Sequence, residues 1–472
     1  MQRLFKYWDM FWIYSDEGFN LIKSMMLMKG YHLYTEIWSD QPPLLTYVLS
    51  VLFRYTGFEV RPGRVMILMV TCILIWAVVQ FTRQAWGDLP AIATAILLPL
   101  LPSFIGLSAA VLVGQPSICF ATLSMFSLAG WHRMRKTYFL LFSGIALGAS
   151  IMTKMFTGFL IPAFACGLLI SEYYYQKDAR NWRYIFRPLV IWGIAFFAAS
   201  IVIGYPALNQ SGIQQLIGTP WRASFSGVSI PEVGTNTILP YLRESTFLLV
   251  LSTIGGILAI RQHRWLMVYP IAWMLLAFIS LMIIKPVWGH QQMLITIPAV
   301  ILAGGAVGCS AMLVINLWQG SSRQLFPILL LALVGIFLVG FLYQRIPSTL
   351  SLFRAPGTPL PETRLSFESK AINRIERFAP QTNWMVTDAP MYAFRAGLAV
   401  PPSLAVISGK RIASGDLTEE EIIKTISQYQ PEQVLLTRFD FPHLRAYLAE
   451  GYHVNLKKDD GTTLYLRKDL SR

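Results

Sequence analysis

Residues 14–45, YSDEGFNLIKSMMLMKGYHLYTEIWSDQPPLL, form a short polar island in an otherwise apolar chain. The island ends in two consecutive prolines, which stiffen the backbone just before the chain turns apolar. It combines aromatic residues with four acidic ones, Asp16, Glu17, Glu36 and Asp40. We interpret this stretch as an active-site loop at a membrane surface and the rest of the chain as its scaffold.

The composition predicts a membrane protein. The chain has 472 residues, of which 54% are hydrophobic and 14% charged, and its mean hydropathy is +0.50. These values are too apolar for a soluble protein and require several membrane spans. The formal charge of +14 would suggest a nucleic-acid partner in a soluble chain, but the basic residues fall at the ends of apolar runs, as membrane topology predicts. No nucleic-acid partner is expected.

Ten apolar segments predict membrane crossings. Basic residues cluster in every second connection between them, which is typical of the cytoplasmic side. The opposite, outer face should then carry the polar island, the turn at 153–155, the loop 208–245, the turn at 285–291 and the C-terminal tail. The crossings lie near residues 64–82, 89–108, 113–130, 138–153, 155–172, 189–207, 246–260, 265–284, 292–315 and 325–343.

The chain before the first crossing, residues 1–63, is predicted to be an outer-face catalytic loop with surface helices. Apolar residues at helical spacing predict one helix over 19–29, which Gly30 ends. The apolar run 43–55 is too short to cross a bilayer and suits a helix that lies flat in the interface. Residues 64–345 form the expected transmembrane domain.

Residues 346–472 have the composition of a soluble α/β domain on the outer face. Strands are expected at 384–387, 433–437 and 463–467, and a helix over 417–430 that opens with a capping box of Thr418 and Glu421. We expect this domain to pack on the membrane part and shape access to it. The fold class is therefore a polytopic α-helical membrane protein of about 10–11 spans with a C-terminal α/β domain.

Asp16 is the candidate general base. A carboxylate near a low-dielectric surface can have its pKa raised toward neutrality, which suits it to take a proton from an incoming hydroxyl or amine. The alternative is that Asp16 only caps the helix that follows, since aspartate is a preferred N-cap residue.

Two further residues stand at the outer ends of spans. Lys154, in SIMTKMFTG, is a lone cation in apolar surroundings, and such a residue either has a partner such as an anionic lipid phosphate or extends to the interface. His290, in IKPVWGHQQM, lies with Lys285 and Trp288 at the mouth of a span, although a lone histidine is more often structural than catalytic.

Several common sites are missing from the sequence. There is no zinc-like cluster of histidine and cysteine, no glycine-rich phosphate loop and no nucleophile elbow, which argues against an ATP-driven pump or a serine hydrolase. The acidic residues could bind a divalent ion such as Mg or Mn, but their spacing does not require one. No metal site is assigned.

The first loop resembles that of the GT-C superfamily of membrane glycosyltransferases. The resemblance rests on DEG at 16–18, KGYHLY at 29–34, DQPPLLTYVLSVLF at 40–53, Gly57 and the basic pair Arg61 and Arg64. The most similar branch is that of protein mannosyltransferases and lipid A aminoarabinose transferases. The resemblance covers about residues 10–345, with looser matches at 153–162 and 289–298.

The resemblance implies a polyprenyl-phosphate-linked sugar as donor and transfer with inversion to an outward-facing lipid, glycan or protein. Such an enzyme is a hexosyl- or pentosyltransferase of the cell envelope, in a bacterial cytoplasmic (inner) membrane with its site on the periplasmic face. Asp16 is the implied catalytic base with Glu17 beside it, and the resemblance implies no direct part in catalysis for the C-terminal domain. Lys154 is implied near the lipid phosphate, where a cation stabilises the charge of the leaving group.

Two features depart from the family pattern. Members generally have a transmembrane helix before the Asp-Glu motif, whereas fifteen residues precede Asp16, so this helix is expected to be missing or the start misassigned. In the aminoarabinose branch a lysine usually precedes the two prolines, and here Gln41 stands there. Arg222 and Arg243 in the outer loop are therefore also expected to contact the donor phosphate. Tyr34, Asp40, Gln41 and His290 are expected to support the substrate and the loop.

Two other classes stay open from the sequence. A transporter of lipid-linked oligosaccharides, or a non-catalytic assembly subunit of the cell envelope, would share the membrane topology, although we find no inverted repeat of the kind transporters contain. A polymerase or ligase that uses a lipid-linked oligosaccharide would be expected to have a larger outer loop than 208–245.

Overall fold

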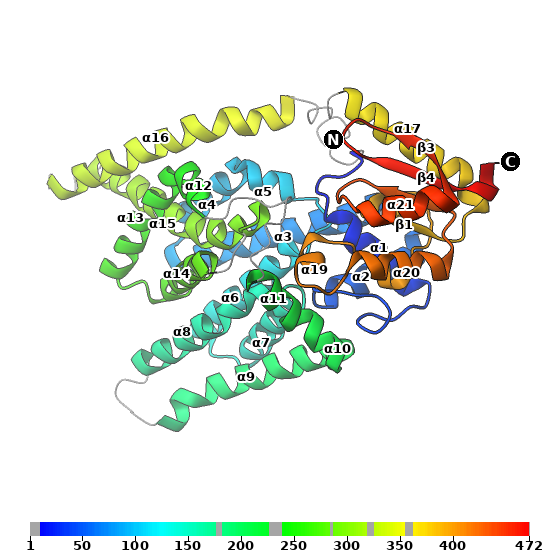
Figure 1. Cartoon of the computed structure of the whole chain (residues 1–472). Helices are drawn as coiled ribbons and strands as arrows, with labels where there is room; N and C mark the ends of the chain where they lie inside the picture. The colour runs from blue at the N-terminus through cyan, green and yellow to red at the C-terminus, as the bar shows by residue number, and fades with distance from the viewer. Residues whose placement is uncertain are drawn as a thin grey trace.

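The computed structural model describes residues 10–175, 182–225, 238–283, 287–318, 325–354 and 362–471. It contains a bundle of apolar helices and a smaller C-terminal part with one sheet, and the first loop lies between the two (Figure 1). The predicted polytopic α-helical class with a C-terminal α/β part is confirmed.

Each predicted crossing has a helical counterpart. Six apolar helical segments are long enough to span a membrane, and four more apolar helices are shorter, among the residues that the structure describes. The main helices are α3 (Val60–Trp86), α4 (Asp88–Leu97), α6 (Gly114–Met134), α7 (Tyr138–Ile151), α8 (Leu160–Tyr175), α9 (Trp182–Gly204), α13 (Thr246–Arg261), α14 (Val268–Ile283), α15 (Met293–Trp318) and α16 (Leu325–Arg354).

Two segments differ from the prediction. The crossing expected at 89–108 is broken into α4, a 3-10 turn at Leu98–Leu100 and α5 (Pro102–Leu107), because prolines at 99 and 102 interrupt the helical hydrogen bonds. The loop 208–245 is largely helical where it is described, with α10 (Gln210–Ile213), a π-helical turn at Gln214–Gly218, α11 (Thr219–Phe225) and α12 (Leu239–Glu244).

The two helices of the first loop are α1 (Glu17–Met28) and α2 (Leu44–Thr56). The prediction that the first of them is a surface helix is wrong, because every residue of α1 from Glu17 to Met26 is buried. It is covered by α2 on one side and by the C-terminal α18 (Met391–Arg395) on another. Gly18 permits this approach, since a Cβ atom there would lie 2.6 Å from the backbone nitrogen of Met391.

The C-terminal part contains a four-stranded sheet of order β1-β2-β4-β3. Strands β1 (Met385–Thr387) and β2 (Gln433–Leu436) are parallel, and β4 (Thr463–Arg467) pairs antiparallel with β2 and with β3 (Tyr452–Lys457). The three predicted strands are confirmed, as is the predicted helix, α20 (Glu419–Tyr429), with its capping box. Five elements were not predicted from the sequence, namely β3, α17 (Glu362–Phe378), α18, α19 (Gly409–Ala413) and α21 (Pro442–Gly451).

The first loop and the C-terminal part share one hydrophobic core. Leu21, Ile22 and Met25 of α1 lie in the same cluster of buried residues as Tyr392 of α18 and Leu435 of β2. Figure 1 shows α1 and α2, drawn in blue, directly beside the orange and red C-terminal elements. Because apolar burial holds the two together, side chains of the C-terminal part have fixed places around the start of α1.

Candidate functional site

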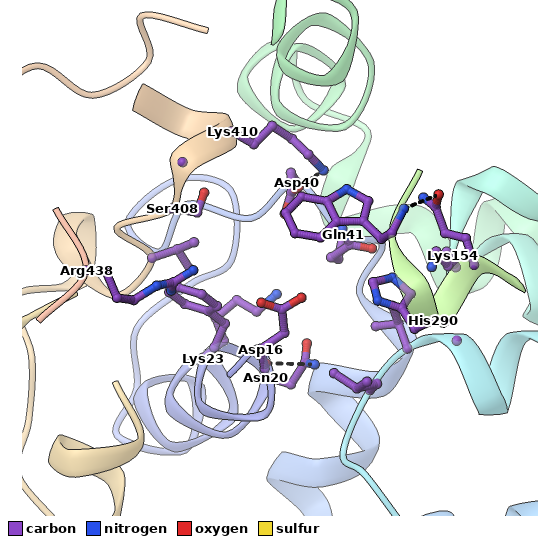
Figure 2. A pocket seen from close by; sticks show the side chains of 18 residues that line it. Asp16, Asn20, Lys23, Asp40, Gln41, Lys154, His290, Ser408, Lys410 and Arg438 are labelled. Carbon is purple, nitrogen blue, oxygen red and sulfur yellow. Dashed lines mark hydrogen bonds and ion pairs between the residues drawn. The ribbon is translucent and has the colours of Figure 1, made fainter. Parts of the chain in front are cut away.

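A cavity of about 140 Å³ lies where the first loop, the membrane helices and the C-terminal part meet. Figure 2 shows the Asp16 carboxylate in its middle, with Lys410 and Asp40 on one side and His290 on another. The lining residues come from the first loop, the membrane part and the C-terminal part: Asp16, Phe19, Asn20, Lys23, Asp40, Gln41, Leu112, Val113, Gly114, Lys154, Trp288, His290, Gln291, Val406, Ser408, Gly409, Lys410 and Arg438.

Asp16 stands at the N-cap position of α1 but its side chain makes no capping hydrogen bond to that helix in the described structure. The capping alternative from the sequence analysis therefore does not account for its carboxylate, which lines the cavity instead. Asp16 is half-buried and lines the cavity, so it remains reachable by a ligand.

The residue next to it, Glu17, holds the start of α1 in place. Its fully buried carboxylate accepts hydrogen bonds from the Arg64 guanidinium of α3, with Nη2 at 2.9 Å and Nε at 3.2 Å. It also accepts from the backbone nitrogens of Ile13 at 2.6 Å and Val111 at 3.0 Å. A buried charge with this many partners is a positioning group, because its lone pairs are already used.

Asn20, one turn further along α1, completes this attachment. Its amide nitrogen donates to the carbonyl oxygen of Val111 at 2.9 Å and to that of Asp16 at 3.4 Å. Glu17 and Asn20 therefore bind both backbone groups of Val111, and the neighbouring Leu112 and Val113 form one wall of the cavity.

Asp40 and Lys410 form an ion pair at the cavity, with Oδ2 and Nζ 2.6 Å apart. Burial opposes ionisation of Asp40, but Lys410 and Lys23 outweigh it and hold the pKa of this carboxyl below its ordinary value. Asp40 raises the pKa of Lys410 in turn, against the effect of burial. Both groups are therefore charged at neutral pH.

Two lysines of the first loop and membrane part also line the cavity. Lys23 is 2% exposed and donates to the Ser39 hydroxyl at 3.1 Å. Burial lowers the pKa of Lys23 to about 8, and burial together with the charge of Lys410 lowers the pKa of Lys154 to about 8. These ammonium groups lack enough counter-charge, and a bound anion would stabilise their protonated form.

His290 forms the wall opposite the C-terminal part. Its ring stacks on Trp288 with centroids 6.4 Å apart and meets the edge of the Tyr14 ring at 6.2 Å. Its Nδ1 atom is buried without a hydrogen-bond partner among the described residues. Buried polar atoms of this kind are rare, and a partner supplied by a ligand would satisfy it.

Arg438 closes the site from the carboxyl end of β2. Its guanidinium lies 5.1 Å from the ring centroid of Phe19 and donates to the Asp388 carbonyl at 3.3 Å. The Asp388 carboxylate is fully buried and accepts from the backbone nitrogens of Thr437, Arg438 and Phe439, at 2.7–3.0 Å. This hydrogen bonding fixes the loop that presents Arg438 to the cavity.

A second cavity of about 510 Å³ adjoins the first. Asp16, Trp288 and Arg438 line both cavities. The wall of the second is more apolar and includes Trp12, Tyr14, Ser15, Gly289, Ala389, Met391 and Thr437. Asp16 therefore lies at the boundary between two separate binding volumes.

The structure brings together five of the predicted site residues, namely Asp16, Asp40, Gln41, Lys154 and His290. Glu17 and Tyr34 act behind the cavity, since the Tyr34 hydroxyl donates to the Gln41 carbonyl at 2.8 Å. Among the described lining residues of the two cavities neither Arg222 nor Arg243 occurs. Arg222 pairs with Asp416 at 2.5 Å, and Arg243 lies exposed in the last turn of α12. Lys285 lies outside the described residues.

Sequence reasoning missed Asn20, Lys23, Ser408, Lys410 and Arg438. The first two could have been found, because positions 16, 20 and 23 fall on one face of a helix. Lys410 and Arg438 carry no local signal, since only the tertiary fold brings them to the first loop.

The described lining of the cavity contains two carboxylates that could hold a metal ion. Its two carboxylates are those of Asp16 and Asp40, and the Asp40 carboxylate is already held by Lys410. No group of three or more His, Cys, Asp or Glu side chains placed to hold an ion occurs within the described ranges. Mg²⁺ usually binds through one or two carboxylates together with waters and substrate phosphates, so these residues neither require nor exclude an ion, and no step below involves one.

Comparisons with known proteins agree with the membrane-protein fold described above. Residues 40–203 match the family described as dolichyl-phosphate-mannose-protein mannosyltransferase. No curated protein matches the sequence of the chain.

Solved structures share the fold over almost the whole chain. ArnT from Cupriavidus metallidurans bound to undecaprenyl phosphate is 15% identical with a TM-score of 0.60, and the match covers 97% of this chain and 94% of that one. The archaeal oligosaccharyltransferase AglB from Archaeoglobus fulgidus, with an inhibitory peptide and a dolichol-phosphate, is 10% identical with a TM-score of 0.57, covering 97% and 71%. The predicted resemblance is confirmed for the fold, which these structures share, and over residues 40–203 for the family match.

Proposed function

With the GT-C fold and the mannosyltransferase family match as premises, we propose that this chain is a membrane glycosyltransferase. It moves a sugar from a polyprenyl-phosphate-linked donor to an outward-facing acceptor, with Asp16 as general base. The observation that carries the proposal is the place of Asp16 at the boundary of two cavities, one of them rich in cations. The orientation, with the site on the periplasmic face of a bacterial inner membrane, is part of the proposal.

The smaller cavity suits the phosphate and sugar of the donor. Its charged walls contain four cationic side chains, Lys23, Lys154, Lys410 and Arg438, against the two carboxylates of Asp16 and Asp40. This excess of positive charge favours an anion, and phosphate oxygens accept hydrogen bonds from ammonium and guanidinium groups. The relatives whose structures contain undecaprenyl phosphate or dolichol-phosphate support a lipid-linked donor of this class.

The larger cavity suits the acceptor. An acceptor hydroxyl or amine that enters past Trp12 and Tyr14 reaches Asp16 from the side away from Lys154 and Lys410, which line only the smaller cavity. Asp16 takes the proton of the acceptor hydroxyl or amine while the acceptor oxygen or nitrogen attacks the anomeric carbon of the donor sugar. The bond from that carbon to the phosphate oxygen breaks, and the electron pair leaves with the phosphate. Attack opposite to the leaving group inverts the anomeric configuration.

The cations lower the barrier of this step. Negative charge grows on the leaving phosphate in the transition state, and fixed ammonium groups in a site of low dielectric stabilise it more than they stabilise the donor. Glu17 and Asn20 keep Asp16 in place through Arg64 and Val111. A transporter of lipid-linked sugars would also need cations for the phosphate, but it would not need a general base at the boundary of two cavities.

The test is turnover with defined donors. Purified protein in lipid nanodiscs is offered a panel of polyprenyl-phosphate-linked hexoses and pentoses, together with total membrane lipids and peptides as acceptors. We expect one donor to be consumed, free polyprenyl phosphate to be released, and the product to have the opposite anomeric configuration by NMR. Transport of an intact lipid-linked sugar across the bilayer without release of polyprenyl phosphate would favour the transporter alternative.

A further inference from the structure

We propose that the C-terminal part supplies a donor-phosphate ligand, Lys410, and that Asp40 of the first loop positions it. The proposal rests on the proposed function, because it assigns a role at the same donor cavity. It also gives the C-terminal part a direct share in the site, contrary to the expectation from the sequence.

Lys410 is well placed for this role. It lines the donor cavity together with Ser408 and Gly409, and Figure 2 shows its side chain extending from α19 toward Asp40 at the edge of the cavity. The Lys410 side chain is 29% exposed and that of Asp40 14%, so the ammonium keeps an open side toward a ligand. An ammonium has three donors, and the described contact with Asp40 uses one of them.

The ion pair is not needed to hold α19 against the rest of the chain, because other contacts already do so. The Arg411 guanidinium lies 4.9 Å from the ring centroid of Trp38 in the first loop. Asp416, just after α19, pairs with Arg222 of α11 at 2.5 Å and accepts from the Thr219 hydroxyl. A third attachment made from a partly buried ion pair gains little stability, since desolvation offsets most of the attraction.

The charges around the pair fit a phosphate ligand. Lys23 and Lys154 face the same volume, and each is short of counter-charge. Asp40 keeps Lys410 protonated and oriented before the donor arrives. A phosphate oxygen that enters then accepts from Lys410 while Asp40 retains the other side of the ammonium. Asp40 is thus a positioning residue, and Lys410 is the residue that touches the donor.

Binding of undecaprenyl phosphate to the full-length protein in nanodiscs tests the proposal, with an uncharged polyprenol of equal length as the comparison ligand. Lys410→Gln should weaken undecaprenyl phosphate binding by about tenfold or more, as expected for one charge-assisted hydrogen bond, and Lys410→Arg should restore most of it. Asp40→Asn should weaken undecaprenyl phosphate binding less than Lys410→Gln does, because the ammonium stays but is no longer held in its orientation. Polyprenol binding should not change in any variant.

Asp416→Asn is the matched control, since it removes an ion pair of the same region outside the cavity. The affinity of this variant for undecaprenyl phosphate should stay within about twofold of that of the parent, which is a smaller change than the loss of one hydrogen bond causes. If Lys410→Gln and Asp40→Asn weaken undecaprenyl phosphate binding equally, the ion pair only holds α19 against the first loop, and the proposal is overturned. Unchanged binding in Lys410→Gln would overturn it as well. If the parent itself binds undecaprenyl phosphate no better than polyprenol, the proposed donor class falls as well. If Lys154→Ala weakens binding and Lys410→Gln does not, only this inference fails.

Discussion

The carboxylate of Glu17 and the guanidinium of Arg64 form a two-pronged ion pair from which solvent is fully excluded. The pair joins α1 to α3 directly behind Asp16. Glu17 is buried away from the cavity and holds in place Asp16, which lines it. The two consecutive acids of the first loop therefore have different surroundings, Glu17 in a buried ion pair and Asp16 at the cavity.

Glu17→Ala should destabilise the protein strongly, because it leaves the Arg64 charge buried without its main partner. Loss of one member of a buried pair costs about 3–5 kcal/mol. Thermal unfolding in detergent, followed by intrinsic fluorescence, measures the effect. The same substitution at the exposed Glu36 should change the unfolding temperature little, and equal effects at the two positions would contradict the positioning role.

Gly18→Ala should loosen the contact between α1 and α18, because the added Cβ atom would lie 2.6 Å from the Met391 nitrogen. Forcing an extra methyl group into a packed interface costs about 1–3 kcal/mol. Hydrogen exchange across residues 385–400 should therefore become faster. Gly106→Ala is the control, since no heavy atom lies within 4 Å of a Cβ built there, and it should leave this exchange unchanged.

Affinity for polyprenyl phosphate should fall above about pH 8. The phosphate binds the ammonium forms of Lys23 and Lys154, whose pKa values burial lowers to about 8, so binding is full below that pH and weakens as it rises. Asp16, Asp40, Lys410, Arg438 and His290 face the same cavity, and Asp40 keeps Lys410 charged over this range.

The contribution of these two lysines to folding has the opposite sign. Their pKa values are lower in the folded chain than in the unfolded chain, so the unfolded chain binds more protons between about pH 8 and 10.5 and this contribution to stability increases with pH. A loss of affinity without a loss of thermal stability across pH 8–9 is therefore expected. Lys154→Arg should flatten the profile because arginine stays protonated. Constant affinity up to pH 10 in the parent would rule out a role for these lysines.

Arg222→Ala and Arg243→Ala should change the KM for the donor by less than about twofold, because neither side chain is among the described lining residues of the cavities. Lys154→Ala should raise the KM for the donor by about tenfold or more. Initial rates over a range of donor concentrations give these values. A tenfold increase for either arginine variant would restore the role expected from the sequence.

The sequence predicts the parts of the site that are close to its unusual local features. Asp16, Asp40 and Lys154 stand out because charges are rare and costly in an apolar chain, and the helices follow from hydropathy. The burial of α1 could not be predicted, since it depends on α18 almost four hundred residues away. The place of Lys410 and Arg438 in the site could not be predicted either, because the residues that flank them have the composition of an ordinary soluble domain.

The most direct test of the account is a comparison of donor binding with single-turnover transfer in Asp16→Asn. We predict that the variant folds and binds the donor within a few-fold of the parent, because the cations of the cavity are unchanged. Transfer should fall by about two to four orders of magnitude, the usual contribution of a general base. Asp416→Asn, an acid removed outside the two cavities, should transfer normally. Transfer at the parent rate in Asp16→Asn would contradict the assignment of Asp16 as the catalytic base.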